Sequence, residues 1–205
     1  LVFVAPGLTE WLLSQYSGCH KSSLRSFRQC LAKADVLEGT SGPWTELRII
    51  FGAKWSAHHN APLGEWASVR VIPLGNEFHP LSVSVADNET EMCAIISSNS
   101  GDWSQALARL AQSATGSFSV EVKGPYPIGG GNWSLRNDDK ATLLVVAGGT
   151  GISGWLSKLH SCSEIKIWRE CHLVWCVRHK SDYVALLDRL PLRNIFVSIY
   201  VTRYT

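Results

Sequence analysis

The spacing of apolar residues divides the chain into a β-rich first part and an alternating α/β second part. β-type sequence begins at about Ala34, and one amphipathic helix is expected at 103–112, after Ser100, Gly101 and Asp102. Short strands with turn signals between them are expected at 45–50, 66–72, 81–85, 92–97 and 118–123. This spacing predicts a small antiparallel barrel at 33–138, preceded by a polar connector.

A different pattern begins after the glycine- and asparagine-rich segment at 129–139. Nearly continuous apolar runs at 142–148, 172–178 and 194–202 alternate with helix-compatible segments at 152–160 and 182–190. Strands that are apolar on both faces are typical of parallel sheets. Residues 139–205 therefore predict part of a doubly wound domain, and the fold class is β + α/β, a six-stranded type of barrel followed by an incomplete parallel-sheet domain.

The glycine turn after the first apolar run is the most informative chemical motif. Residues 149–154 read Gly-Thr-Gly-Ile-Ser-Gly, a G-x-G-x-x-G between a strand and a helix. Glycines let the backbone approach a pyrophosphate, and a helix N-terminus favours its charge. Glycine also serves tight turns on steric grounds alone. The motif predicts a nucleotide site made by Gly148, Gly149, Thr150 and Gly151.

Basic residues end the next predicted strand. Arg178, His179 and Lys180 stand where an NAD site would have a carboxylate for the ribose hydroxyls. A basic cluster suits a 2′-phosphate, so the cluster favours NADPH over NADH. The alternative is a solvated loop with no ligand.

Composition excludes some classes of function. The net charge is +2, and no dense stripe of Lys and Arg indicates a nucleic-acid partner. The six cysteines form no C-x-x-C pair and the seven histidines no metal-binding spacing, so no metal site is predicted. We interpret the cysteines as reduced cytosolic thiols.

The first 32 residues leave two interpretations open. Residues 1–13 are apolar but too few to span a bilayer, and His20, Lys21, Arg25 and Arg28 follow. Such a segment could be the end of a membrane helix with a basic cytoplasmic connector. It could equally be an amphipathic helix with a basic solvent face.

Five motifs, in the same order along the chain, resemble the ferric-chelate reductases and the related NADPH oxidases. The matching segments are 78–84 (His-Pro-Phe-Thr/Ser in the family), 100–104 (Gly-Asp-Trp-Thr), 122–126 (Asp-Gly-Pro-Tyr-Gly), 147–157 (Ala-Gly-Gly-x-Gly-Ile-Thr-Pro) and 173–178 (Leu-Ile-Trp-x-x-Arg). Residues 4–13 are similar to the end of the family's last haem-domain helix. The resemblance implies hydride transfer from NADPH to FAD, and then single electrons to haem and an external acceptor.

The same resemblance assigns residues to roles. It places His79 near the flavin phosphates and ribityl chain, and Leu81 and Ser82 at the flavin ring, and it includes Pro80 among the cofactor-binding residues. Ser82 would be catalytic, because its hydroxyl lies within reach of the flavin N5 and can tune it. Gly124, Pro125 and Tyr126 would wall the flavin or the interdomain cleft. Gly148, Gly149, Thr150 and Gly151 would hold the nicotinamide nucleotide, and Arg178 its adenosine end.

The chain departs from the family pattern at several positions. Leu81 replaces an aromatic residue, Pro127 a glycine, and Ser153-Gly154 a Thr-Pro pair. The paired haem histidines and the C-terminal Cys-Gly-Pro segment of the family are not in this sequence. We therefore expect a fragment of a multi-pass membrane protein, with this portion facing the cytosol and a haem-bearing membrane domain as its partner. A superoxide-generating oxidase and a degenerate flavodomain without catalysis remain alternatives, although the Gly-Gly-Thr-Gly-Ile form favours the reductase.

Overall fold

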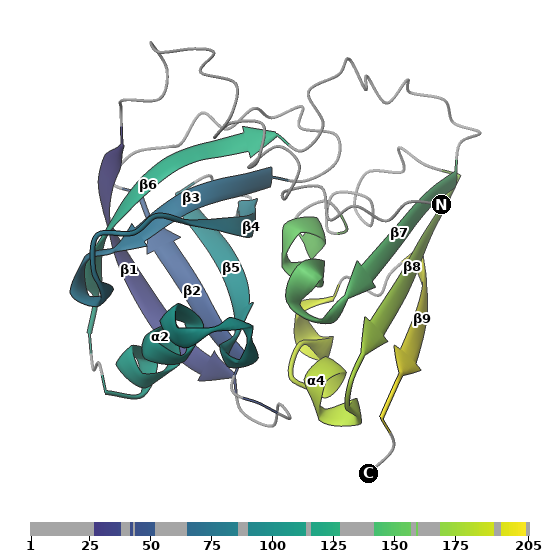
Figure 1. Cartoon of the computed structure of the whole chain (residues 1–205). Helices are drawn as coiled ribbons and strands as arrows, with labels where there is room; N and C mark the ends of the chain where they lie inside the picture. The colour runs from purple at the N-terminus through teal and green to yellow at the C-terminus, as the bar shows by residue number, and fades with distance from the viewer. Residues whose placement is uncertain are drawn as a thin grey trace, which may run out of the picture.

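Two units lie side by side in the computed structural model, a closed β-barrel and a smaller α/β unit (Figure 1). The structure describes residues 27–37, 42, 44–51, 65–85, 90–113, 116–127, 142–156, 159, 169–190 and 194–203. The predicted membrane-helix end at 1–13, most of the connector that follows it up to residue 32, and the expected domain boundary at 138 lie outside these residues. No helix in the described ranges has the length and apolar character needed to cross a membrane.

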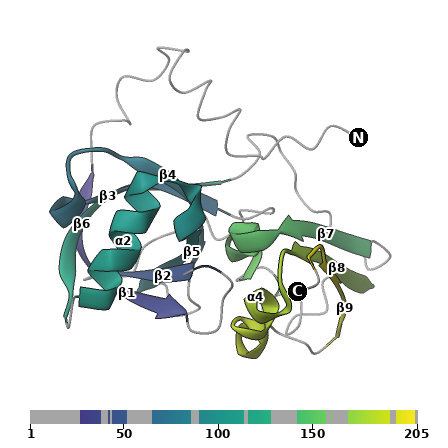
Figure 2. The same cartoon turned by 60° about the horizontal axis from the view of Figure 1, so that its bottom comes forward.

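Six antiparallel strands close the barrel in the order β1-β2-β5-β4-β3-β6. They are β1 (Arg28–Leu37), β2 (Trp44–Ile50), β3 (Glu65–Val71), β4 (His79–Val85), β5 (Glu91–Ser97) and β6 (Phe118–Pro127), with short 3-10 turns η1 (Ile72–Leu74) after β3 and η2 (Ser98–Ser100) after β5. Alternate apolar side chains of each strand point inward, such as Leu47 and Ile49 on β2. Helix α2 (Asp102–Ser113) adds Leu107 to this core and lies across the end of the barrel that faces the viewer in Figure 2.

The strand β1 begins earlier than the sequence indicated. It starts at Arg28, inside the segment expected to be a connector, and pairs with both β2 and β6. The residues that it buries in the barrel core are small, Ala32 and Ala34, and most of its outward positions are polar. This composition gives a weak strand signal, although the barrel cannot close without the strand.

The α/β unit is a parallel sheet in the order β7-β8-β9. Its strands are β7 (Thr142–Gly148), β8 (Glu170–Val177) and β9 (Ile195–Val201), and its turns and helices are η3 (Gly149–Trp155), α4 (Lys180–Val184) and η4 (Leu187–Arg189). The expected helix at 152–160 begins as the 3-10 turn η3, and the expected helix at 182–190 is broken into α4 and η4. Leu190 is extended because Pro191 follows it, so η4 ends there.

Only one face of this sheet is covered by described residues. Val145, Leu173 and Trp175 pack under η3 and α4 and are buried. On the opposite face Leu144 and Phe196 are both 61% exposed. The apolar strands predicted a sheet that is covered on both faces, and the described residues cover one of them.

An apolar interface joins the two units. Leu37, Trp44 and Ile95 project outward from the barrel and are buried in the same cluster as the core of the α/β unit. From the other side, Leu186 and Leu190 belong to this cluster. The interface places the end of β4 beside η3, where the predicted site residues meet (Figure 1).

Candidate functional site

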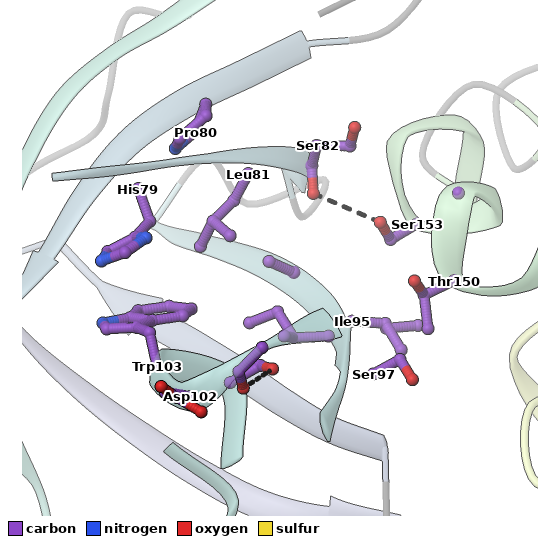
Figure 3. A pocket seen from close by; sticks show the side chains of 15 residues that line it. His79, Pro80, Leu81, Ser82, Ile95, Ser97, Asp102, Trp103, Thr150 and Ser153 are labelled. Atoms are coloured by element: carbon purple, nitrogen blue, oxygen red, sulfur yellow. Dashed lines mark hydrogen bonds between the residues drawn. The ribbon is translucent and has the colours of Figure 1, made fainter. Parts of the chain in front are cut away.

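A cavity of about 490 Å³ opens where the barrel meets the glycine turn (Figure 3). It contains the four predicted flavin-site residues of β4, 79–82, together with residues of β5, the start of α2 and η3. The lining comprises His79, Pro80, Leu81, Ser82, Ala94, Ile95, Ile96, Ser97, Gly101, Asp102, Trp103, Ser104, Thr150, Gly151 and Ser153.

The cavity exists because β4 and β5 separate. In the described part of the chain they pair at Ser84 with Cys93 and at Val85 with Met92. The first part of β4 therefore has β3 as its described neighbour on one side alone. The opened edge exposes Ser82 and directs Leu81 into the cavity (Figure 3). The aliphatic side chain thus occupies the position that the family resemblance gives to an aromatic ring.

His79 and Trp103 form one wall of the cavity. Their rings stack with centroids 4.1 Å apart, as Figure 3 shows. Burial lowers the pKa of His79, and the Glu77 carboxylate, 3.8 Å from Nε2, opposes this shift. The Nε2 atom is buried and makes no hydrogen bond within the described chain. A neutral imidazole at this position can donate a hydrogen bond to a polar ligand or accept one from it.

The N-terminus of α2 forms the cavity floor. Gly101, which has a φ of +141°, leads into Asp102 at the first helical position. The Ser104 hydroxyl donates to the carbonyl of Gly101 at 2.7 Å and to that of Ser98 at 3.1 Å, which fixes the turn. The first N–H groups of a helix have no partner within it, so this end suits a diphosphate.

A hydrogen bond connects the glycine turn to the flavin segment. The buried Ser153 hydroxyl donates to the carbonyl of Ser82 at 3.2 Å, across the interface (Figure 3). Sequence reasoning noted Ser153 only as a departure from a motif, and no local pattern signals this contact. The bond holds η3 beside β4.

A second cavity, of about 400 Å³, lies at the carboxyl ends of β7 and β8. Its lining comprises Trp44, Ser97, Asn99, Gly148, Gly149, Thr150, Cys176, Val177, Arg178, Asp182 and Thr202. The carboxyl end of a parallel sheet is where nucleotides bind in doubly wound folds. Because Ser97 and Thr150 line both cavities, the two are neighbours.

The glycine turn is held from below. Gly149 has a φ of +49°, and its carbonyl accepts a hydrogen bond from the buried Trp175 indole at 2.9 Å. A Cβ on Gly148 or Gly151 would meet no atom within 4 Å, so the outer side of the turn is open to a ligand. The residues present therefore fit a dinucleotide.

Gly124 and Tyr126 are not brought into the described lining of either cavity. The Tyr126 ring packs over Gly124, where a Cβ would lie 2.9 Å from Cδ2, and its centroid is 4.7 Å from that of Trp66. Trp66 pairs with both Ser82 and Tyr126, so these residues form a row across three strands. The Pro125 side chain lies outside the described residues, and the flavin-wall role of this segment stays a prediction.

Comparison with known proteins supports the fold. No protein-family model matches the chain. A probable metalloreductase (AIM14) from Scheffersomyces stipitis is 30% identical over 114 residues, which are 52% of this chain and 21% of that protein. The ferredoxin reductase in carbazole 1,9a-dioxygenase superposes with a TM-score of 0.67 at 15% identity, over 86% of this chain and 51% of that chain. A ferredoxin NADP+ reductase from Neisseria gonorrhoeae with bound FAD and NADP gives 0.61 at 16%, over 87% and 70%.

These likenesses show the predicted fold, a six-stranded antiparallel barrel followed by a parallel-sheet unit, as in the ferredoxin reductases. The chain spans about half the length of the first reductase and about a fifth of the metalloreductase.

Proposed function

We propose that this chain is the flavin- and nicotinamide-binding portion of an NADPH-dependent oxidoreductase. The observation that carries the proposal is the adjacency of the two cavities, which share Ser97 and Thr150. Two ligands that exchange a hydride must lie side by side with water excluded. The reductases that superpose on the chain, one of them with FAD and NADP bound, support the same function.

The first cavity would hold FAD. Leu81 and Ser82 lie where they would contact the flavin ring, while the N-terminus of α2 and His79 would receive the diphosphate and the adjoining polar groups. Bound FAD supplies two-electron chemistry toward NADPH and one-electron chemistry toward the next carrier. The Ser82 hydroxyl would donate a hydrogen bond to the flavin, and the Ser153 hydroxyl holds the backbone of Ser82 in place.

The second cavity would hold NADPH. Gly148, Gly149 and Thr150, which line this cavity, would receive its diphosphate. Gly151 lines the first cavity instead, where the space beside its Cα is open. Arg178 would bind the 2′-phosphate, since a guanidinium offers a planar fork of donors for phosphate.

The electron acceptor would be the haem of a membrane domain, which would in turn reduce ferric chelates. The resemblance in five ordered motifs and the partial match to a probable metalloreductase support this acceptor. The parent protein would be membrane-bound, with this portion in the cytosol. A non-catalytic flavodomain is the second candidate, because Leu81 offers no aromatic ring to the flavin.

The test is a pair of titrations on the full 205-residue chain. We expect FAD to bind more tightly than FMN, and NADP+ more tightly than NAD+. Gly151→Gln should weaken nucleotide binding, because the glutamine side chain would enter the open space beside the turn. Gly116→Gln is the matched control, since Gly116 also has open space but lies in neither cavity.

The expected results separate the two candidates. FAD binding followed by reduction with NADPH would support the oxidoreductase. FAD binding without reduction would favour the non-catalytic flavodomain. If neither nucleotide bound, or if the two glycine variants behaved alike, the proposed sites would be wrong.

A further inference from the structure

A buried carboxylate lies at the junction of the two units. Glu46 projects outward from β2, and its side chain is only 5% exposed because the α/β unit covers it. Arg189 of η4 donates a hydrogen bond from Nη1 to Oε1 and forms an ion pair with it. The Cys93 thiol donates to the same oxygen at 3.2 Å, and Arg48 Nε lies 3.6 Å from Oε2.

The two residues of this ion pair lie on the two chain segments that supply opposite walls of the second cavity, although neither residue lines it. Arg189 ends the segment Arg178–Arg189, in which Arg178 and Asp182 line the cavity. Asp182 fixes that segment by accepting a hydrogen bond from the backbone N–H of His179 at 3.1 Å. The opposite wall contains Trp44, which is two residues before Glu46 on β2.

We infer that Glu46 and Arg189 are positioning residues that set the separation of these walls and hence the affinity for the nicotinamide nucleotide. The inference rests on the proposed function, because it assigns this cavity to that ligand. Neither residue lines the cavity, so the effect passes through β2 and through the segment that ends in η4.

An ion pair can set the separation of the walls more accurately than the apolar contacts around it. Burial of Leu186 and Leu190 against the barrel is non-directional and allows small displacements. A carboxylate held by a guanidinium is directional, and removing one partner leaves an uncompensated buried charge. The hydrogen bond to Glu46 raises the pKa of Arg189, and burial together with the charge of Glu46 raises the pKa of Cys93, so the thiol stays a donor.

The chain offers a matched pair of variants. Arg189→Gln and Arg48→Gln each remove a guanidinium beside the same carboxylate, but Arg48 is on β2 and does not bridge the units. Glu46→Gln is a second probe that leaves no buried charge, since Arg189 is 36% exposed and can be hydrated. Each variant of the full chain is titrated with NADP+ by calorimetry and with FAD by fluorescence, and its melting temperature is measured.

We expect Arg189→Gln and Glu46→Gln to raise the Kd for NADP+ by about tenfold, and the Kd for FAD by less than about twofold. Arg48→Gln should change neither. The inference would be overturned if the bridging variants lost affinity for NADP+ and FAD equally, or if Arg189→Gln and Arg48→Gln had equal effects on NADP+ binding. Either result would mean that the ion pair only stabilises the fold in general. Unchanged NADP+ binding in both bridging variants would overturn it while leaving the proposed function intact. A wild-type chain that binds no NADP+ would refute both.

Discussion

Replacing Trp175 by phenylalanine tests whether the indole of Trp175 holds the glycine turn in the conformation that binds a nucleotide. The Trp175 indole is fully buried in the α/β core, and its N–H donates to the Gly149 carbonyl at 2.9 Å. Phenylalanine keeps most of the apolar volume but removes the donor. The Gly149 carbonyl then loses the bond that opposes rotation out of its φ of +49°.

The size of the effect follows from two contributions. The lost hydrogen bond costs about 1 kcal/mol net, and more if the carbonyl stays buried without a donor. The smaller ring leaves part of the core unfilled, at about 1–2 kcal/mol. For a chain of this size, a total of about 2–3 kcal/mol lowers the melting temperature by roughly 5–10 °C. If half of this free energy is lost from the nucleotide-binding conformation of the turn, the Kd for NADP+ rises by about tenfold.

Leu173→Val is the control for this prediction. Leu173 is on the same strand and in the same buried cluster, and no described hydrogen bond involves its side chain. Calorimetric melting and NADP+ titration of both variants separate packing from positioning. We expect both variants to melt earlier and only Trp175→Phe to lose affinity. Equal affinity in the two variants would refute the idea that the indole positions the turn.

Three further predictions concern the cavities. Ser82→Ala should slow flavin reduction by NADPH about tenfold to hundredfold in stopped-flow absorbance, with little change in melting temperature, because it removes one donor to the flavin. Arg178→Ala should reduce the preference for NADPH over NADH about tenfold in steady-state kinetics. Burial lowers the pKa of His79, so the unfolded chain takes a proton at higher pH than the folded chain. Stability should therefore fall as pH drops below about 6.5, and His79→Gln should flatten that part of the melting-temperature profile.

Each of these predictions has a contrary result. Unchanged reduction kinetics in Ser82→Ala would remove its catalytic role. If Arg178→Ala reduced activity with NADH and with NADPH equally, the role of the arginine would be structural. An acid profile that is the same with and without His79 would mean that other groups cause the loss of stability.

The sequence predicted the elements whose signals are local. The apolar run of β7 with its glycine turn, and the His79–Ser82 segment, were identified and lie at adjoining cavities. Much of β1 was missed, because the residues that it buries in the barrel core are two alanines and most of its outward residues are polar. The contact between Ser153 and Ser82 and the pair of Glu46 with Arg189 join residues 71 and 143 positions apart, a separation at which no motif operates.

The parting of β4 from β5 has a consequence for folding. A closed barrel is held by continuous ladders of backbone hydrogen bonds, and among the described residues the seam between β4 and β5 has two residue pairs. Local opening is easiest where such ladders are short. A flavin seated in the gap would bridge the two edges, and a ligand that binds only the closed form stabilises it by mass action. In the cell, the flavin supply would then set how much of this chain survives proteolysis, quite apart from its use in redox chemistry.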